Sequence, residues 1–106
     1  MRTDDPADAR AEPSPGTVIW MLGPVIARAD IPVLCDRIAL ALDRGATLVI
    51  CDVSTVTRAD VATIDALARL HLIARRRGGR ILVRGADPRL VGLLGLVGLL
   101  EVLPLA

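Results

Sequence analysis

Aromatic side chains are almost absent from this chain of 106 residues, in which Trp20 stands alone and neither Phe nor Tyr occurs. A hydrophobic core must therefore be built from Leu, Val, Ile and Ala, in a sequence that is 53% apolar. Without further rings, the chain offers few groups on which a base or a sugar could stack. The length suits one domain with an apolar core that needs neither disulfides nor a metal.

Lysine is absent too, so all 13 basic residues are arginines, and the net charge is only +1. A dedicated nucleic-acid-binding protein concentrates basic residues on one face, so this near balance argues against that class. The one basic run, residues 75–77, closes a predicted helix, where cations complement the negative end of the helix dipole. A contact with phosphate or RNA is the alternative interpretation of that run.

Groups for catalysis or metal binding are few, with 2 cysteines and 1 histidine. Cys35 and Cys51 lack a Cys-x-x-Cys spacing, which is typical of small buried side chains in a reducing compartment. A triad of Ser54, His71 and Asp60 fails because about three helical turns separate the last two residues. The sequence therefore predicts a protein that is not an enzyme and has no catalytic residue, metal site or cofactor.

Long apolar runs are missing as well. The stretch at residues 90–100 is almost wholly apolar, but it has about half the length of a membrane span, and three glycines interrupt it. We expect a packed helix followed by a turn, with no direct membrane insertion. The chain does not begin with a charged segment followed by an apolar one, which predicts a cytoplasmic protein without a signal peptide.

The order of apolar strands and amphipathic helices predicts an α/β domain at residues 17–106, after a flexible, proline-containing tail at residues 1–16. The predicted strands span residues 17–22, 47–53 and 80–84. The predicted helices begin at the capping residues Asp30, Asp60 and Asp87 and end near residues 44, 77 and 96. We also expect a short strand at residues 25–27 and an extended segment or strand at residues 102–105.

The most informative stretch is residues 48–70, where a strand runs through a polar loop into a long helix. The strand ends in Cys51, Asp52, Val53 and Ser54. Asp60 then stands at the N-cap of the helix, where its carboxylate can accept hydrogen bonds from the free amides of the first turn, those of Ala62 or Thr63. Side chains at this corner are presented to partners.

This stretch, together with residues 23–30, 80–88 and 99–104, resembles the STAS domain, the fold of anti-sigma factor antagonists and of the cytoplasmic tails of sulfate transporters. The resemblance covers residues 17–105. It implies a STAS-like (SpoIIAA-like) α/β fold, with a mixed β-sheet of largely parallel strands covered by about three to four α-helices.

In that family an Asp-Ser-Ser-Gly motif opens the helix, and a partner kinase phosphorylates its second serine in the antagonists. Residues 60–63 occupy the place of this motif, and only Asp60 matches it. Ala62 stands where the phosphorylated serine would be and carries no hydroxyl. Thr63 is the nearest candidate phosphorylation site, although its position favours a capped or buried hydroxyl; Ser54, Thr55 and Thr57 are alternative acceptors.

The helix at residues 60–77 has two faces when its residues are placed about 100° apart. The side expected to face the sheet carries Ala66, Leu67, Leu70, Ile73 and Ala74. The opposite side carries Val61, Asp65, Ala68, Arg69, Leu72 and Arg76. On that side Val61, Ala68 and Leu72 form an apolar stripe between charges, which indicates either a partner-binding surface or a tolerated surface pattern.

By resemblance, the chain is a non-enzymatic regulatory module that binds a protein partner, an anti-sigma factor of the kinase-like type, and lacks the usual phosphorylatable serine. The residues expected to bind the partner are Ser54, Thr57, Arg58, Asp60, Val61, Ala62, Thr63, Asp65, Ala68 and Leu72. The alternative is an accessory subunit of a lipid-transporting ABC system, in which the same helix face docks on an ATPase. The apolar surplus at residues 90–103, with Trp20, also predicts a homodimer.

Overall fold

A computed structural model describes residues 16–105 of the chain, so the predicted flexible tail lies outside the described residues except for Gly16. The elements follow in this order: β1 (Thr17–Met21), a 3₁₀ turn η1 (Arg28–Asp30), α2 (Ile31–Asp43), β2 (Leu48–Asp52), α3 (Val61–Arg76), β3 (Arg80–Arg84), α4 (Pro88–Leu96) and a 3₁₀ turn η2 (Leu99–Glu101). The predicted helices and the three main predicted strands are confirmed, with ends that shift by about one residue, which is within the usual scatter of element boundaries.

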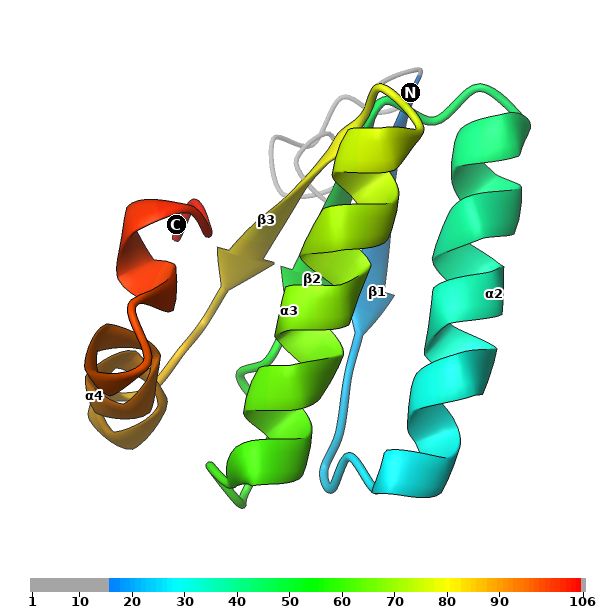
Figure 1. Cartoon of the computed structure of the whole chain (residues 1–106). Helices are drawn as coiled ribbons and strands as arrows, with labels where there is room; N and C mark the ends of the chain where they lie inside the picture. The colour runs from blue at the N-terminus through cyan, green and yellow to red at the C-terminus, as the bar shows by residue number, and fades with distance from the viewer. Residues whose placement is uncertain (1–15, 106) are drawn as a thin grey trace, which may run out of the picture.

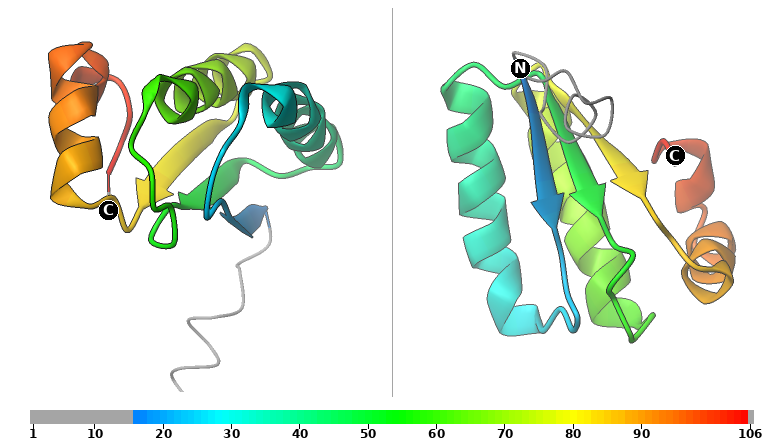
Figure 2. Two further views of the ribbon diagram at one scale, coloured as in Figure 1. Left: turned by 90° about the horizontal axis from the view of Figure 1, so that it is seen from below. Right: turned by 180° about the vertical axis from the view of Figure 1, so that it is seen from behind.

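The three strands form one parallel sheet in the order β1-β2-β3, with β2 in the centre. Helices α2 and α3 lie side by side on one face of this sheet, and α4 lies beside β3 (Figures 1 and 2). The predicted α/β class is confirmed, and every strand pairing within residues 16–105 is parallel. Two right-handed crossovers through α2 and α3 are the usual way to join such strands.

Two local predictions are wrong. Residues 25–27 form no strand, because Gly23 and Pro24 end β1 and the chain turns into η1. Asp30 immediately precedes α2, but its side chain does not cap the helix, and its backbone is already helical. Its carboxylate instead accepts a hydrogen bond from the amide of Ala27, three residues earlier in the chain, at 3.0 Å. Asp87 behaves as predicted and accepts from the Leu90 amide at 2.9 Å.

The core lies between the sheet and the two helices. Alternate strand residues face the helices and are fully buried, among them Val49 and Cys51 on β2 and Ile81 and Val83 on β3. Burial raises the pKa of the Cys51 thiol to about 12, so this group stays a neutral apolar side chain. Cys51 is buried as predicted, whereas Cys35 is only half-buried; both are free thiols.

Helix α3 divides into the two predicted faces. Ala66, Leu67, Leu70 and Ala74 are completely buried against the sheet, and Ile73 is half-buried beside them. On the opposite side Val61 is 69% exposed and Leu72 is 51% exposed. The inner face therefore supplies stability, whereas the outer face contributes little to the protein's own core.

The predicted dimer patch does not exist as one surface. Trp20 lies on β1, whereas α4 lies beyond β3, at the other edge of the sheet (Figure 1). Leu90, Leu94 and Leu103 are moreover buried in the protein's own core, which accounts for much of the apolar surplus at residues 90–103. No helix within residues 16–105 is long and apolar enough to cross a membrane.

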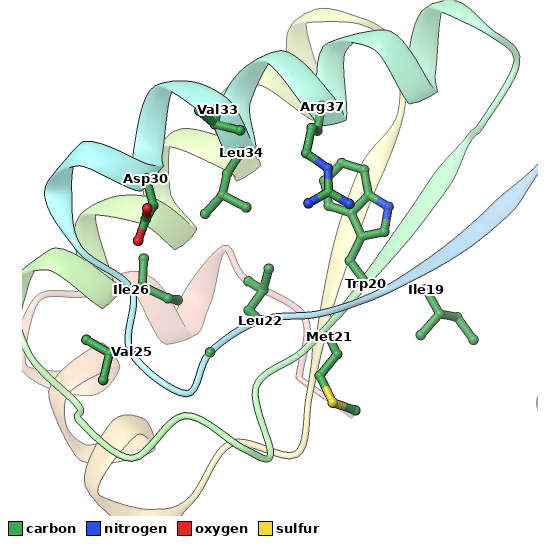
Figure 3. A pocket seen from close by; sticks show the side chains of 11 residues that line it. Ile19, Trp20, Met21, Leu22, Val25, Ile26, Asp30, Val33, Leu34 and Arg37 are labelled. Carbon is green, nitrogen blue, oxygen red and sulfur yellow. The ribbon is translucent and has the colours of Figure 1, made fainter.

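The extended segment predicted at residues 102–105 closes the outer edge of β3. Leu105 forms a parallel bridge with Val83, whose amide donates to the Pro104 carbonyl at 2.9 Å. Along β1, at the other edge, lies a hollow of about 420 Å³ between β1 and α2 (Figure 3). Its floor includes Trp20, with the Arg37 guanidinium 5.0 Å from the ring centroid.

The difference between the two faces of α3 can be measured with two substitutions two residues apart. We expect Leu70→Ala to lower the free energy of unfolding by about 2–5 kcal/mol, because it leaves a cavity in the core. Leu72→Ala should change it by less than about 0.5 kcal/mol, because that side chain is half in solvent. Urea denaturation followed by circular dichroism measures both, and equal effects would contradict this description of α3.

Candidate functional site

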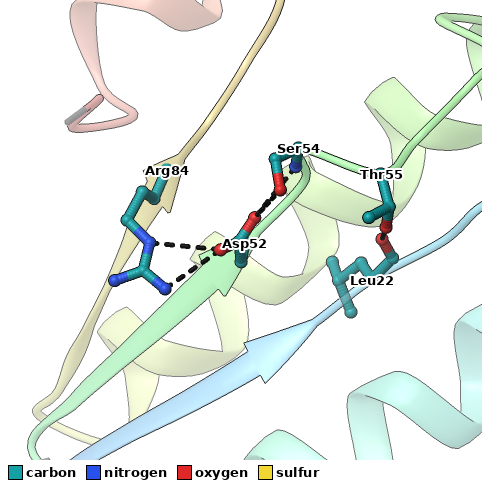
Figure 4. A network of polar contacts seen from close by, with 5 residues as sticks. All are labelled: Leu22, Asp52, Ser54, Thr55 and Arg84. Carbon is teal, nitrogen blue, oxygen red and sulfur yellow. Dashed lines mark hydrogen bonds and ion pairs between the residues drawn. The ribbon is translucent and has the colours of Figure 1, made fainter. Parts of the chain in front are cut away.

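A buried aspartate at the carboxyl end of β2 organises the loop that leads to α3. The Asp52 Oδ1 atom accepts hydrogen bonds from the Ser54 amide at 2.9 Å and from the Ser54 hydroxyl at 2.6 Å (Figure 4). Its Oδ2 atom accepts from Arg84 Nε at 3.2 Å and from Arg84 Nη2 at 3.0 Å. One carboxylate thus joins β2, its following loop and β3.

The charge of Asp52 is well stabilised in this arrangement. The pKa of its carboxyl lies below the ordinary value because the Ser54 hydroxyl and amide donate to it, and Arg84 adds hydrogen bonds and a positive charge. Partial burial opposes this shift but is outweighed. Above the carboxyl's ordinary range the group is ionised, and it contributes stability that is lost as the pH falls through the lowered pKa.

The loop at residues 53–60 is tied to the segment that follows β1. The Thr55 hydroxyl donates to the Leu22 carbonyl at 3.1 Å (Figure 4). The Thr57 amide and hydroxyl both donate to the Pro24 carbonyl, at 2.8 and 3.3 Å. These bonds anchor the loop before it reaches α3.

A glycine allows the loop to pass close to β3. Gly85 has a φ of +80°, and a Cβ atom there would lie 2.7 Å from the Ser54 Cβ. Any other residue would meet both a strained backbone and a collision with the loop. The close approach of Gly85 therefore belongs to the same structural unit as the Asp52 carboxylate.

The first turn of α3 is capped as the sequence predicted. Asp60 Oδ1 accepts from the Thr63 amide at 3.0 Å, which satisfies one of the free donors at the helix start. The pKa of Asp60 lies below its ordinary value, first because of this amide hydrogen bond and then because of the Thr63 hydroxyl and the nearby Arg58. The carboxylate therefore caps the helix in its charged form.

The Thr63 side chain is part of the cap and not of the surface. Its hydroxyl lies 3.1 Å from both the Arg58 carbonyl and the Asp60 carboxylate, and the residue is 0% exposed. A kinase could reach this hydroxyl only if the first turn of α3 opened. The sequence had favoured this capped, buried role over a phosphorylation site.

Outside the cap, α3 borders a shallow apolar groove. The groove has a volume of about 340 Å³ and is lined by Val61, Ile64, Asp65, Ala68, Val97 and Leu99. Its second wall comes from the turn after α4, a contribution that the sequence did not reveal. Two residues of the apolar stripe predicted on α3, Val61 and Ala68, thus form one side of a groove.

Two arginines flank the polar side of this groove. Arg69 Nε lies 2.9 Å and Arg28 Nη1 lies 3.3 Å from the Asp65 carboxylate, and both arginine side chains are mostly exposed. Exposed ion pairs of this kind contribute only about 0.2–1 kcal/mol each. Their main effect is to neutralise Asp65 and to place two guanidinium groups at that side of the groove.

The structure gathers most of the predicted binding residues around the start of α3. Val61, Asp65 and Ala68 line the groove, Asp60 caps the helix, and Leu72 extends the exposed stripe. The other predicted residues are divided between the loop (Ser54, Thr57, Arg58), the half-buried Ala62 and the buried Thr63. The long-range contacts of Arg28, Arg84, Val97 and Leu99 with this region were missed, because no local sequence signal reports them.

Ser54 and His71, two groups weighed above for catalysis, have separate surroundings in the structure. The Ser54 hydroxyl is held by Asp52, and burial together with Arg75 lowers the pKa of His71 on α3. Within residues 16–105, no three potential metal ligands of the His, Cys, Asp or Glu type lie together. The arrangement is that of an apolar surface on a firmly held helix start, which suits protein binding.

Comparison with known families identifies residues 18–104 with a model described as "Mlab, STAS domain". No curated protein sequence matches the chain significantly. The match to the family model spans nearly all of the elements described above.

Solved structures with a similar fold include three proteins. TM1081 from Thermotoga maritima has a TM-score of 0.77 at 14% identity, with 90% of this chain and 77% of that chain covered. The anti-sigma factor antagonist SpoIIAA from Bacillus, unphosphorylated, has a TM-score of 0.70 at 17% identity, covering 88% and 82%. A sulfate transporter family protein from Wolinella succinogenes has a TM-score of 0.70 at 25% identity, covering 94% and 82%. The first two likenesses show the fold alone.

The role of Asp52 can be tested with a matched pair of Asp→Asn variants. In Asp52→Asn an amide replaces the carboxylate beside Arg84, and we expect the free energy of unfolding to fall by about 1–3 kcal/mol. Amides of residues 53–57 should exchange faster with deuterium. Asp43→Asn, which removes an exposed ion pair with Arg77, should cost less than about 1 kcal/mol and leave the loop unchanged. Equal results for both variants would refute the organising role of Asp52.

Proposed function

The chain belongs to the STAS domain family, whose model spans residues 18–104, and we propose that it is a regulatory protein-binding module without enzymatic activity. Its docking surface comprises the loop at residues 53–60, the start and outer face of α3, and the turn after α4. From the sequence-based set, the exposed or half-buried members of this surface are Ser54, Thr57, Arg58, Asp60, Val61, Ala62, Asp65, Ala68 and Leu72. Val97 and Leu99 complete it.

One observation carries this proposal. Val61, the first residue of α3, is an exposed apolar side chain at the mouth of an apolar groove, and the Asp60 cap holds the backbone beneath it. Exposed apolar surface of this kind gains free energy when a partner covers it. A rigid backbone adds to the affinity, because little conformational entropy is lost on binding.

An anti-sigma factor of the kinase-like type is the partner we favour. The support is the likeness in fold to SpoIIAA, an anti-sigma factor antagonist. Binding of such a regulator would release a sigma factor, and a sigma factor acts in the cytoplasm. The groove offers apolar contacts at its centre and guanidinium groups at its rim, the usual composition of a protein interface.

A transporter subunit is the alternative, and two observations favour it. The matching family model carries the description "Mlab", and one solved structure of similar fold belongs to the sulfate transporter family. In this case the same outer face of α3 would dock on the ATPase of a lipid-transporting ABC system. The alternative concerns the identity of the partner and leaves the binding surface unchanged.

The second part of the proposal is that phosphorylation at the start of α3 does not control docking. A phosphate at this place would weaken a close interface by repulsion and by the cost of desolvating it. Ala62 carries no hydroxyl, and the Thr63 hydroxyl is buried in the cap. The protein is therefore binding-competent at all times or regulated elsewhere.

The absence of this switch predicts the result of a phosphorylation assay. After incubation with ATP and an extract of the native cells, we expect mass spectrometry to find no phosphate at residues 60–63. Ala62→Ser restores the hydroxyl at an accessible position and serves as the positive control for kinase activity in the extract. Stoichiometric phosphate on Thr63 of the unaltered protein would contradict the proposal.

The docking surface can be tested by affinity capture of the full chain followed by mass spectrometry. A captured histidine-kinase-like regulator supports the sigma-factor pathway, and a transporter ATPase supports the alternative. We expect Val61→Arg and Leu72→Glu each to weaken the affinity for the captured partner at least tenfold, which corresponds to about 1.4 kcal/mol.

Matched controls are available on α2, where Val33 is 59% exposed and Leu40 is 50% exposed. Val33→Arg and Leu40→Glu introduce the same charges on a different surface and should leave the affinity per protomer unchanged. If Val61→Arg and Leu72→Glu bind the partner as well as the unaltered protein does, the proposed surface is wrong.

A further inference from the structure

The apolar stripe on the outer face of α3 has a polar border on one side. With residues about 100° apart along a helix, Asp65 and Arg69 fall on the same side of the stripe. The Arg28 guanidinium reaches Asp65 at 3.3 Å from η1, the turn that leads into α2. The border toward α2 is therefore made of one carboxylate and two guanidinium groups.

The border on the other side of the stripe is apolar. Ile64 falls on this side by the same helical spacing, and Val97 and Leu99 from the turn after α4 line the groove together with it. Val97 is 55% exposed, so it is open to a neighbouring molecule. A partner lying on the stripe thus meets apolar side chains along one flank and charged ones along the other.

The length of the stripe and the state of its backbone limit what can lie on it. From Val61 to Leu72 the stripe extends for about 16 Å, or three helical turns. The backbone groups of α3 are hydrogen-bonded within the helix, so they cannot pair with a strand. An extended segment on this face would lose hydrogen bonds to water and gain none, whereas a helix satisfies its own backbone.

The two arginines have hydrogen-bonding capacity that Asp65 does not use. Among residues 16–105, each of the side chains of Arg28 and Arg69 makes one hydrogen bond, to Asp65. A guanidinium group carries five N–H donors. Together the two arginines carry one positive charge more than Asp65 neutralises, and a carboxylate from a partner would complement it.

We propose, on the basis of the docking surface proposed above, that the partner's docking element is an amphipathic α-helix of about three turns with an acidic residue beside its apolar face. Its apolar residues recur three and four positions apart and cover the stripe and the groove. Its Asp or Glu lies on the side toward α2 and accepts hydrogen bonds from Arg69 and Arg28. A helix with an apolar face that lies in an apolar groove is a recurring mode of recognition.

A second copy of this chain fits the surface less well than such a helix. Its α2 would present the exposed Val33 and Leu40, but the exposed Arg37 lies between them along the helix, together with Asp36. The guanidinium of Arg37 would offset the acid that the polar border favours. A contact of α2 with α3 would also be heterologous and would not close at two chains.

A peptide library tests the chemistry of the partner before its identity is known. Random peptides of about 16 residues, long enough for four helical turns, are displayed on phage and selected on the immobilised full chain. Peptides that also bind Val61→Arg are removed. We expect the enriched peptides to share apolar residues at helical spacing and an Asp or Glu at one fixed position beside them.

An enriched peptide labelled with fluorescein then serves as the probe in anisotropy titrations. Arg69→Glu and Arg28→Glu should each weaken its affinity about tenfold, because a like charge then faces the peptide's acid. Changing that acid to Arg should restore the affinity for Arg69→Glu. Arg44→Glu makes the same charge change at the exposed far end of α2 and should have no effect. Circular dichroism should show that the peptide gains helix on binding.

Several outcomes would overturn this proposal. They are enriched peptides that stay extended or carry a basic residue in place of the acid, a library without any peptide that Val61→Arg rejects, and an equal loss of affinity with Arg44→Glu and Arg69→Glu. Self-association in sedimentation that Val61→Arg abolishes would assign the surface to a second copy instead. The proposed function is decided separately, by the affinity of the captured partner for Val61→Arg and Leu72→Glu.

Discussion

The ion pair between Asp52 and Arg84, with the two hydrogen bonds from Ser54, is the interaction on which the rest of the docking region depends. It lies at the point where the chain leaves the sheet, and it fixes the direction of the loop that leads to α3. A largely buried carboxylate is stable at this position only because both of its oxygens accept hydrogen bonds, one from Ser54 and the other from Arg84. The loop leads from this ion pair to Asp60, which caps α3, the helix whose first residue, Val61, is exposed.

The arrangement of layers explains why the outer side of α3 is exposed. Both long helices lie on one face of the sheet, and the core of Leu, Val, Ile and Ala fills the space between them (Figure 2). The outer side of α3 is not needed for this core. Exposed apolar side chains there contribute little to stability, so the core leaves them available for the contacts proposed above.

The start of α3 is the place at which the proposed binding and the lack of a switch meet. Ala62 carries no hydroxyl, and the Thr63 hydroxyl completes the cap. The sequence was sufficient to recognise the missing hydroxyl, because it is a property of one residue. It also favoured the buried role of Thr63, because helical periodicity turns that residue toward the sheet.

Local chemistry in the sequence determined the helices, the main strands, the Asp60 cap and the two faces of α3, because periodicity and capping act over a few residues. The same reasoning was wrong for residues 25–27 and for Asp30, where an unforeseen 3₁₀ turn intervenes. Only the tertiary structure placed Arg84 on Asp52, closed the groove with Val97 and Leu99, and put Trp20 and α4 at opposite edges. These neighbours are far apart in the chain, and the order of the strands, which no local pattern encodes, decides which of them meet.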